Sequence, residues 1–345
     1  MKSRRSILIW LFLLQALILC MIAVGGITRL TESGLSMTDW KPILGSVPPL
    51  SEADWIGRFE QYKQFPEFIK LRSDMTLPEF KFIFIWEYLH RMLGRVIGLV
   101  YLFPMLYFVW IRKAFRDDPE VESGRSSPWP RRLSLGFMLL VAQGLMGWFM
   151  VLSGLSDRPA VSHFRLAAHL SMAFALFLYL ASLIIRLRPR PVAPEAKSLR
   201  GLAILTFLCL CVQVVFGAFV AGLKAGKVFN TWPKMGRSWI PEGVIDPALG
   251  LSSLVQLVPS VQFVHRWLAV PVVILACWLG WKAMKRSDLV AWGKILFALV
   301  LAQFALGVWA LLSAVALPVA VAHQLNACLV LLATFAIGFR GRAAD

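Results

Sequence analysis

The stretch 82-FIFIWEYLHRMLGRVIGLVYLFPMLYFVW-110 is long and apolar enough to cross a membrane as one helix, yet it carries Glu87, His90, Arg91 and Arg95 near one end. A hydrocarbon core of roughly 30 Å is crossed by about 20 helical residues. Ionisable side chains in such a helix are costly and usually mark a functional site. We therefore expect these side chains to face a partner inside a helix bundle.

Apolar runs of this kind recur along a chain that is 58% hydrophobic. The first run is too long for a removable signal peptide and lacks a small-residue cleavage site, so we expect it to be retained. The pattern predicts an all-α polytopic membrane protein with eight transmembrane helices. The predicted spans lie at about 7–27, 84–111, 133–154, 164–186, 201–222, 262–282, 292–314 and 318–339.

The net charge of +17 follows the predicted topology. Lys and Arg collect at alternate helix ends, as in MKSRR and KAMKR, whereas the long loops 28–81 and 223–261 are nearly balanced or mildly basic. By the positive-inside rule both termini are cytoplasmic and the long loops lie outside. The charge therefore does not indicate nucleic-acid binding. The lack of a transit-like N-terminal extension favours a bacterial plasma membrane.

The chain contains an internal repeat of four helices. Gly25 aligns with Gly217 and Trp40 with Trp232, and WEYLHRMLG matches VQFVHRWLA. Two further segments repeat in the same order, LVAQGLMGWFMVLSG with LVLAQFALGVWALLSA, and RLAAHLSMAF with AVAHQLNACL. We predict two repeated four-helix bundles, at 1–190 and 198–345, separated by the Pro/Arg-rich linker at about 186–197. In the first bundle, a capping-box pattern from Ser51 to Asp54 opens a helical lid in the outer loop.

Four of the five histidines occupy equivalent positions in this repeat, each expected within about two turns of the outer end of its helix. Two imidazoles that face each other across a bundle can ligate a haem iron. Each bundle supplies only two, with no carboxylate or thiolate cluster to complete a zinc site. Packing roles are the alternative. The predicted metal ligands are His90, His169, His265 and His323.

The fifth histidine, His163, has no counterpart in the repeat and is expected in the connection before the fourth helix. Its simplest role is that of a surface or interfacial residue. The five cysteines all fall within predicted spans, so no outer-loop disulfide is indicated.

Two arginines follow the predicted ligands directly, and the residue three positions before each ligand differs between the halves. Arg91 and Arg266 are predicted to bind cofactor propionates, because guanidinium groups match carboxylates. For Arg95 two roles are open: it binds a propionate, or it extends to the lipid headgroups on the outer side. Glu87 is replaced by Gln262 in the second half, and only a carboxylate acts as a base. We therefore predict that chemistry takes place in the first half.

The sequence resembles the haem A synthase family over nearly its whole length. The resemblance rests on GGITRLTESGLSMTDWKPILGSVPP, EYLHRMLGR, DRPAVSHFRLAAH, GAFVAGLKAGKVFNTWPKM, VHRWLA and AHQLNA. It implies oxidation of the C8 methyl of haem O to a formyl group, through successive hydroxylations, to give haem A for cytochrome oxidase. It also implies haem b between His265 and His323, with haem O near His90 and His169 and Glu87 as the catalytic carboxylate.

The resemblance further implies partners. These are the haem O substrate, haem O synthase, cytochrome oxidase assembly factors, an electron donor and membrane lipid. The lack of a paired outer-loop cysteine is similar to the proteobacterial and mitochondrial branch. The alternatives are a quinol-linked di-haem b-type electron-transfer protein that does not modify haem, and a transporter with parallel repeats.

Overall fold

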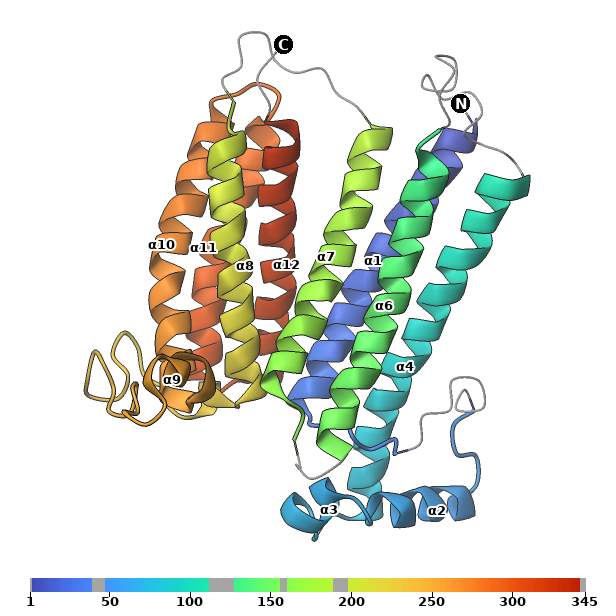
Figure 1. Ribbon diagram of the computed structural model, residues 1–345, viewed down its shortest axis with the longest axis vertical. Helices are drawn as coiled ribbons and strands as arrows, with labels where there is room; N and C mark the ends of the chain where they lie inside the picture. Colours follow the sequence, from blue (N-terminus) through green and yellow to red (C-terminus); the bar gives the residue numbers. More distant parts are fainter. Residues whose placement is uncertain (1, 39–46, 112–126, 156–159, 189–197, 342–345) are drawn as a thin grey trace. The chain divides into compact units, whose positions relative to one another are not determined.

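The computed structural model describes residues 2–38, 47–111, 127–155, 160–188 and 198–341 and is built from helices (Figure 1). In this part of the chain, eight helices are long and apolar enough to cross a membrane, which confirms the predicted fold class. They are α1 (Lys2–Leu30), α4 (Leu77–Leu106, continued by η2, Tyr107–Ile111), α6 (Trp129–Leu155), α7 (His163–Leu187), α8 (Arg200–Gly222), α10 (Val258–Met284), α11 (Val290–Leu312) and α12 (Leu317–Arg340).

Shorter helices occupy the long loops. These are α2 (Glu52–Tyr62), α3 (Pro66–Leu71), η3 (Ala225–Lys227), η4 (Gly250–Ser252) and α9 (Ser253–Gln256). The predicted capping box opens α2, with Asp54 N–H donating to Ser51 Oγ and Ser51 N–H donating to Asp54. A second capping box, between Thr76 and Glu79, opens α4. Trp40 and the linker residues 189–197 lie outside the described residues.

Two helix starts differ from the sequence-based expectation. His163 is the first residue of α7 and not part of the preceding connection. His90 lies 13 positions after Leu77, more than three turns into α4, so the expected two-turn depth is wrong for this histidine. The cause is the second capping box, which lets α4 begin early and extend to the lid. His169, His265 and His323 lie within about two turns of the first residue of their helices, as expected.

The chain divides into two compact units. The first contains Met1–Arg165 and Ala175–Leu187, and the second contains Leu166–Phe174 and Arg188–Asp345. Helix α7 therefore contributes to both units.

In the first unit, α1 packs along α4, and side-chain donors tie the helices to backbone carbonyls of their neighbours. Trp10 Nε1 donates to Val100 O at 2.7 Å, and Tyr101 OH donates to Leu133 O at 3.0 Å. Tyr179 OH donates to Arg132 O at 2.7 Å, which connects α7 to α6. Buried N–H and O–H groups need such partners where water is excluded.

The lid consists of α2 and α3, which lie at one end of α4 (Figure 1). Its apolar side packs on the first turns of α4, in a cluster of Phe59, Tyr62, Phe80, Ile83 and Phe84. The rings of Phe59 and Phe80 stack with centroids 5.0 Å apart. The sequence predicted this lid from the helical spacing of its aromatic residues.

In the second unit, α8, α10, α11 and α12 form a four-helix bundle. Helices α10 and α12 each pack against α8 and α11 and barely touch each other, so they occupy opposite corners. Where α10 meets α11 the backbones are in contact. A Cβ added at Gly293 would lie 2.7 Å from Gly280 O, so this crossing requires glycine.

Candidate functional site

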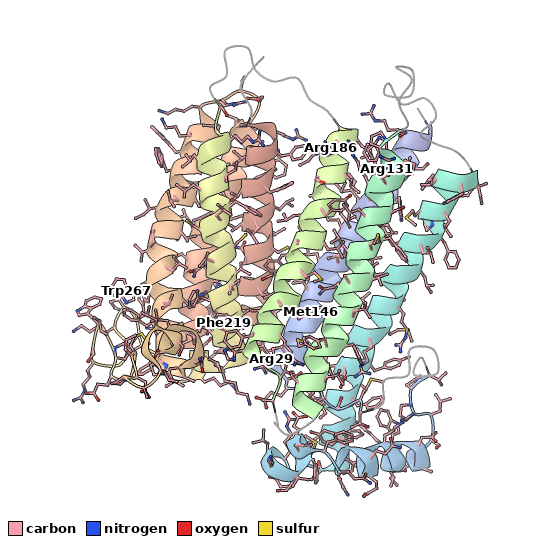
Figure 2. All side chains as sticks on the ribbon, in the orientation of Figure 1. Arg29, Arg131, Met146, Arg186, Phe219 and Trp267 are labelled. Carbon is pink, nitrogen blue, oxygen red and sulfur yellow. The ribbon has the colours of Figure 1, made fainter. Side chains whose placement is uncertain are left out.

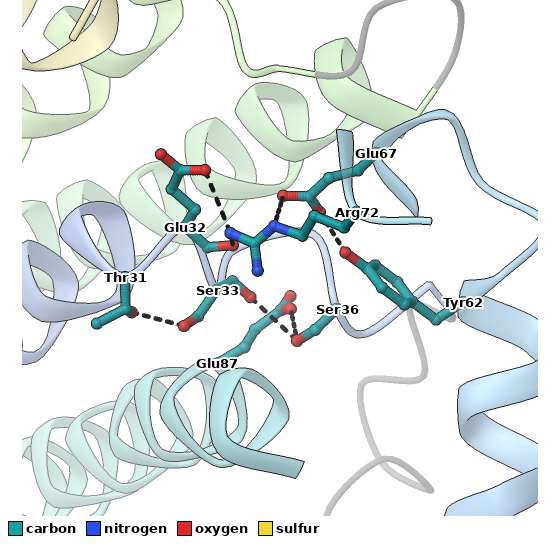
Figure 3. Close-up of polar contacts among 8 residues, drawn as sticks. All are labelled: Thr31, Glu32, Ser33, Ser36, Tyr62, Glu67, Arg72 and Glu87. Carbon is teal, nitrogen blue, oxygen red and sulfur yellow. Dashed lines mark hydrogen bonds and ion pairs between the residues drawn. The ribbon is translucent and has the colours of Figure 1, made fainter. Parts of the chain in front are cut away.

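Among the described acids of the first unit, Glu87 on α4 is the most buried, at 2% exposed. Ser36 Oγ donates to Glu87 Oε2 at 2.7 Å (Figure 3), and Met37 N donates to the same oxygen at 2.7 Å. Arg91, one turn later, donates from Nη2 to Glu87 Oε1 at 2.5 Å and to Met37 O at 2.9 Å. Three donors therefore fix the orientation of the carboxylate, and the guanidinium offsets its charge.

The loop that supplies two of these donors is itself tightly held. Helix α1 ends at Leu30, and Glu32 follows with a φ of 56°, in the left-handed region. Ser33 N donates to Thr28 O at 2.8 Å, and the hydroxyls of Thr31 and Ser33 lie 2.6 Å apart. These contacts turn the chain back over the end of α1, which brings Ser36 to Glu87.

In the second unit, the equivalent loop is held by side chains that donate to its backbone carbonyls. Gln262, which takes the place of Glu87, is also 2% exposed, but its Nε2 donates to Phe229 O at 3.4 Å. Arg266 donates to the carbonyls of Phe229 and Thr231, the latter at 2.8 Å. Lys224, at the position equivalent to Glu32, has a φ of 54°. Arg266 thus contacts a loop carbonyl as Arg91 does. Glu87, however, accepts hydrogen bonds from its loop, whereas Gln262 donates one to its loop.

Among the predicted ligands of the first half, His90 lies against α1. A Cβ added at Gly25 would come within 3.2 Å of His90 Nε2. His169 lies in the segment of α7 that belongs to the second unit. Its neighbours Ala167 and Leu170 pack on an apolar cluster with Ala218 of α8. Because the two histidines belong to different units, their pairing stays a prediction.

The other two predicted ligands belong to one bundle. His265 lies on α10 and His323 on α12, the helices at opposite corners. Each imidazole lies against a glycine of an adjacent helix. A Cβ added at Gly217 would lie 3.1 Å from His265 Cε1, and one at Gly307 would lie 2.9 Å from His323 Cε1. Both residues are half-buried.

Two glutamines contact these imidazoles. Gln213 Nε2 lies 3.1 Å from His265 Nδ1 and donates to His265 O at 2.9 Å. Gln303 Nε2 lies 3.3 Å from His323 Nε2, and Asn326 orients this amide by donating to Gln303 Oε1 at 2.8 Å. His323 Nδ1 is buried and has no hydrogen-bond partner in the described part of the chain.

These features fit a group that takes two axial nitrogen ligands. The two imidazoles lie on opposite helices, and each ring packs so closely on a glycine of an adjacent helix that a larger side chain there would collide with it. The buried ring nitrogen of His323 also lacks the partner that buried polar atoms normally have. Within the described ranges, no group of three or more His, Cys, Asp or Glu side chains gathers as metal ligands would. Two imidazole donors in one bundle are compatible with a haem iron held at both axial positions.

A second polar network connects the lid to the end of α1 (Figure 3). Tyr62 OH donates to Glu67 Oε2 at 3.2 Å, and Arg72 Nε lies 3.8 Å from Glu67 Oε1. Arg72 Nη2 also pairs with Glu32 Oε2 at 3.2 Å. Burial raises the pKa of Glu67 to about 7, against the opposing effects of Arg72 and Tyr62. The negative charge of Glu87 nearby acts in the same direction as burial.

Aromatic residues surround the equivalent loop of the second unit. Trp267, on α10, lies beside the loop between α8 and α10 (Figure 2), with its ring 6.1 Å from that of Trp239. Lys234 Nζ lies 5.7 Å from the Trp239 ring. Tryptophan is enriched at membrane–water interfaces, which is consistent with a loop at this level.

Residues 8–335 match the family model described as "Cytochrome oxidase assembly protein". The chain belongs to this family. Curated relatives that match this chain over nearly its whole length carry the name "Heme A synthase". That of Rhodospirillum centenum is 42% identical over 325 residues, covering 93% of this chain and 84% of the relative. That of Rhizorhabdus wittichii is 45% identical over 328 residues, covering 94% and 90%.

The match to a third family member is longer still. The "Heme A synthase" of Maricaulis maris is 42% identical over 342 residues, covering 99% of this chain and 97% of the relative. These matches cover 93–99% of this chain. Family membership therefore applies to the whole chain and not to one bundle alone.

Sequence reasoning identified Glu87, Arg91 and Arg266, and the structure shows partners that it did not foresee. Both arginines contact loop carbonyls, where propionates were expected as partners. Ser36 was missed because a single buried hydroxyl has no periodic signal. The available signal was its replacement by Val228 in the aligned segment, which parallels the replacement of Glu87 by glutamine.

Proposed function

We infer that this chain is a haem A synthase, a multi-pass membrane oxidoreductase that converts haem O to haem A. The observation that carries this inference is the full-length similarity to relatives named "Heme A synthase". The eight apolar helices and the histidine arrangement are consistent with it. The finer assignment is oxidation of the C8 methyl of haem O to a formyl group.

Haem b is proposed to bind in the second bundle (198–345), between His265 and His323. The support is their placement on opposite helices and the glycine beside each ring. When bound, this cofactor would supply electron transfer. Arg266 would contribute a positive charge near its propionates, because its guanidinium contacts carbonyls and no carboxylate in the described residues.

The substrate haem O is proposed to bind in the first bundle (1–190), near His90 and His169, with the lid over this site. Glu87 is the proposed catalytic carboxylate. It is the acid that the second half lacks, and its donors hold it in one orientation next to the turn that carries His90. Its role would be to accept a proton or to stabilise positive charge at the carbon being oxidised.

The proposed location is the bacterial plasma membrane, with both termini cytoplasmic and the lid outside. The support is the distribution of Lys and Arg between the loops. Haem O synthase, cytochrome oxidase assembly factors and an electron donor are the proposed partners, in addition to lipid.

The test is expression of the chain in a host that makes haem O and no haem A, followed by chromatography of the extracted haems. Haem A is expected with the native chain and not with an empty vector. A chain that retains haem b and leaves haem O unchanged would be a di-haem electron-transfer protein, and the inference would be wrong.

A further inference from the structure

Ser36 differs from the other donors to Glu87 in what its atoms can do. The Met37 N–H and the Arg91 guanidinium only donate, so neither can accept the proton of a protonated Glu87 carboxyl. A hydroxyl both donates and accepts. Ser36 Oγ lies 2.7 Å from Glu87 Oε2 and 3.0 Å from Ser33 O (Figure 3).

These two distances define two hydrogen-bond arrangements. When Glu87 is ionised, the single Ser36 hydroxyl proton points to Oε2, because a bond to a charged acceptor is the stronger one. When Glu87 carries a proton on Oε2, the Ser36 hydroxyl rotates to donate to Ser33 O and accepts the Glu87 proton. Rotation about one bond serves both states, and no heavy atom moves.

The surroundings keep Ser36 at this position. Its side chain is 2% exposed, so water does not replace the hydroxyl. The backbone of Ser33, a residue that is 0% exposed, is held by its own N–H, which donates to Thr28 O at 2.8 Å. The acceptor Ser33 O is therefore as fixed as Glu87.

The second half of the chain provides a natural comparison. With Gly25 aligned to Gly217, Ser36 corresponds to Val228 and Met37 to Phe229. The arginine contact persists, since Arg266 donates to Phe229 O as Arg91 donates to Met37 O. The hydroxyl disappears together with the acid. An amide does not exchange a proton in this way and needs no partner that both donates and accepts.

We propose that Ser36 is a positioning residue for Glu87, whose hydroxyl holds the carboxyl group in one orientation with and without its proton. This proposal rests on the proposed function, in which Glu87 handles a proton during oxidation of haem O. Ser36 does not touch substrate in this assignment and acts through Glu87 alone.

The experiment compares Ser36→Ala with Ser33→Ala in the haem O to haem A assay. Both remove one buried hydroxyl from the same loop, and only the first contacts Glu87 through its side chain. Ser36→Ala is expected to lower haem A formation about tenfold or more, the scale of one lost hydrogen bond to a charged group. The pH dependence of the rate is also expected to change. Ser33→Ala should stay within about threefold of the native rate, with an unaltered pH dependence.

Two further variants separate positioning from folding. Ser36→Cys keeps nearly the native volume with a weaker donor and acceptor, and is expected between native and Ser36→Ala. In a Glu87→Gln background, Ser36→Ala should lower the remaining turnover of haem O by less than about twofold. The reason is that a residue that acts through Glu87 has no further effect when Glu87 is absent. Equal losses for Ser36→Ala and Ser33→Ala, or additive losses with Glu87→Gln, would overturn the proposal.

A measurement that does not depend on enzyme activity distinguishes failure of the proposed haem A synthase function from failure of the proposed positioning role of Ser36. Infrared difference spectroscopy on pH change detects the carboxyl band that Glu87→Gln removes. Ser36→Ala should shift this band and Ser33→Ala should leave it in place. No shift would refute the positioning role even if haem A is produced, and a shift would support it even if the native chain produced none.

Discussion

Replacing Glu67 by glutamine is expected to remove most of the pH dependence of lid docking. Glu67 is 5% exposed in the closed lid, and burial raises its pKa to about 7. In an open lid this carboxyl returns to its ordinary pKa near 4.5. Between these values the closed lid binds more protons than the open one, so docking weakens as the pH rises through this window.

The size of the effect follows from the difference in pKa. About 2.5 units at 1.36 kcal/mol each correspond to about 3 to 4 kcal/mol, or roughly a three-hundredfold change in the opening equilibrium. Docking is strongest below about pH 4.5 and levels off above about pH 7. A glutamine at position 67 does not ionise and still accepts from Tyr62 OH, so the variant should show at most a threefold change.

Hydrogen–deuterium exchange of α2 and α3 peptides at pH 5 and pH 8, corrected for the intrinsic exchange rate, measures this opening. Glu60→Gln, at an exposed position of α2 whose acid pairs with Lys63, is the matched control and should behave like the native chain. If native protein and Glu67→Gln showed the same pH dependence, Glu67 would not be the titrating group, and the argument from burial would be wrong.

Three further outcomes are expected from single substitutions. Glu87→Gln should retain haem b and accumulate haem O or a hydroxylated intermediate, seen by chromatography; a native yield of haem A would remove Glu87 from the mechanism. His265→Ala should lose the absorbance of tightly held haem b, and an unchanged spectrum would contradict the division between bundles. Phe80→Ala should destabilise lid docking by about 3 kcal/mol or more, since it empties the centre of the aromatic cluster; protease sensitivity of α2 is the measurement, and native resistance would refute it.

Hydropathy and capping were sufficient to predict the fold class, because both act locally. The eight spans follow from apolar length, and the lid helix from the Ser51 capping box and its aromatic spacing. The depth of His90 was mispredicted because the span was bounded by hydropathy, whereas the Thr76–Glu79 capping box starts α4 at Leu77. The diagonal placement of α10 and α12 needs coordinates, since sequence order does not fix which helices are neighbours.

The candidate site was predictable where the two halves of the sequence differ. The exchange of Glu87 for Gln262 marked the acid, but two of its three hydrogen-bond donors come from a loop 50 and 51 residues away, and Ser36 has no local signal. The burial of Glu67 was also hidden, because a six-residue helix with mixed charges reads as surface. Contacts of this kind depend on where loops fold back onto the helices, which the periodicity of the sequence does not predict.

The docking of α2 through one side has a practical consequence for structure determination. Phe59 and Tyr62 face α4, while Glu52, Gly57 and Gln61 are exposed on the remaining surface. This outward surface would accept a fused fiducial domain or the epitope of an antibody fragment without disturbing the helices in the membrane. A small protein that is mostly embedded in a detergent micelle would thereby gain a rigid feature for particle alignment in cryo-electron microscopy.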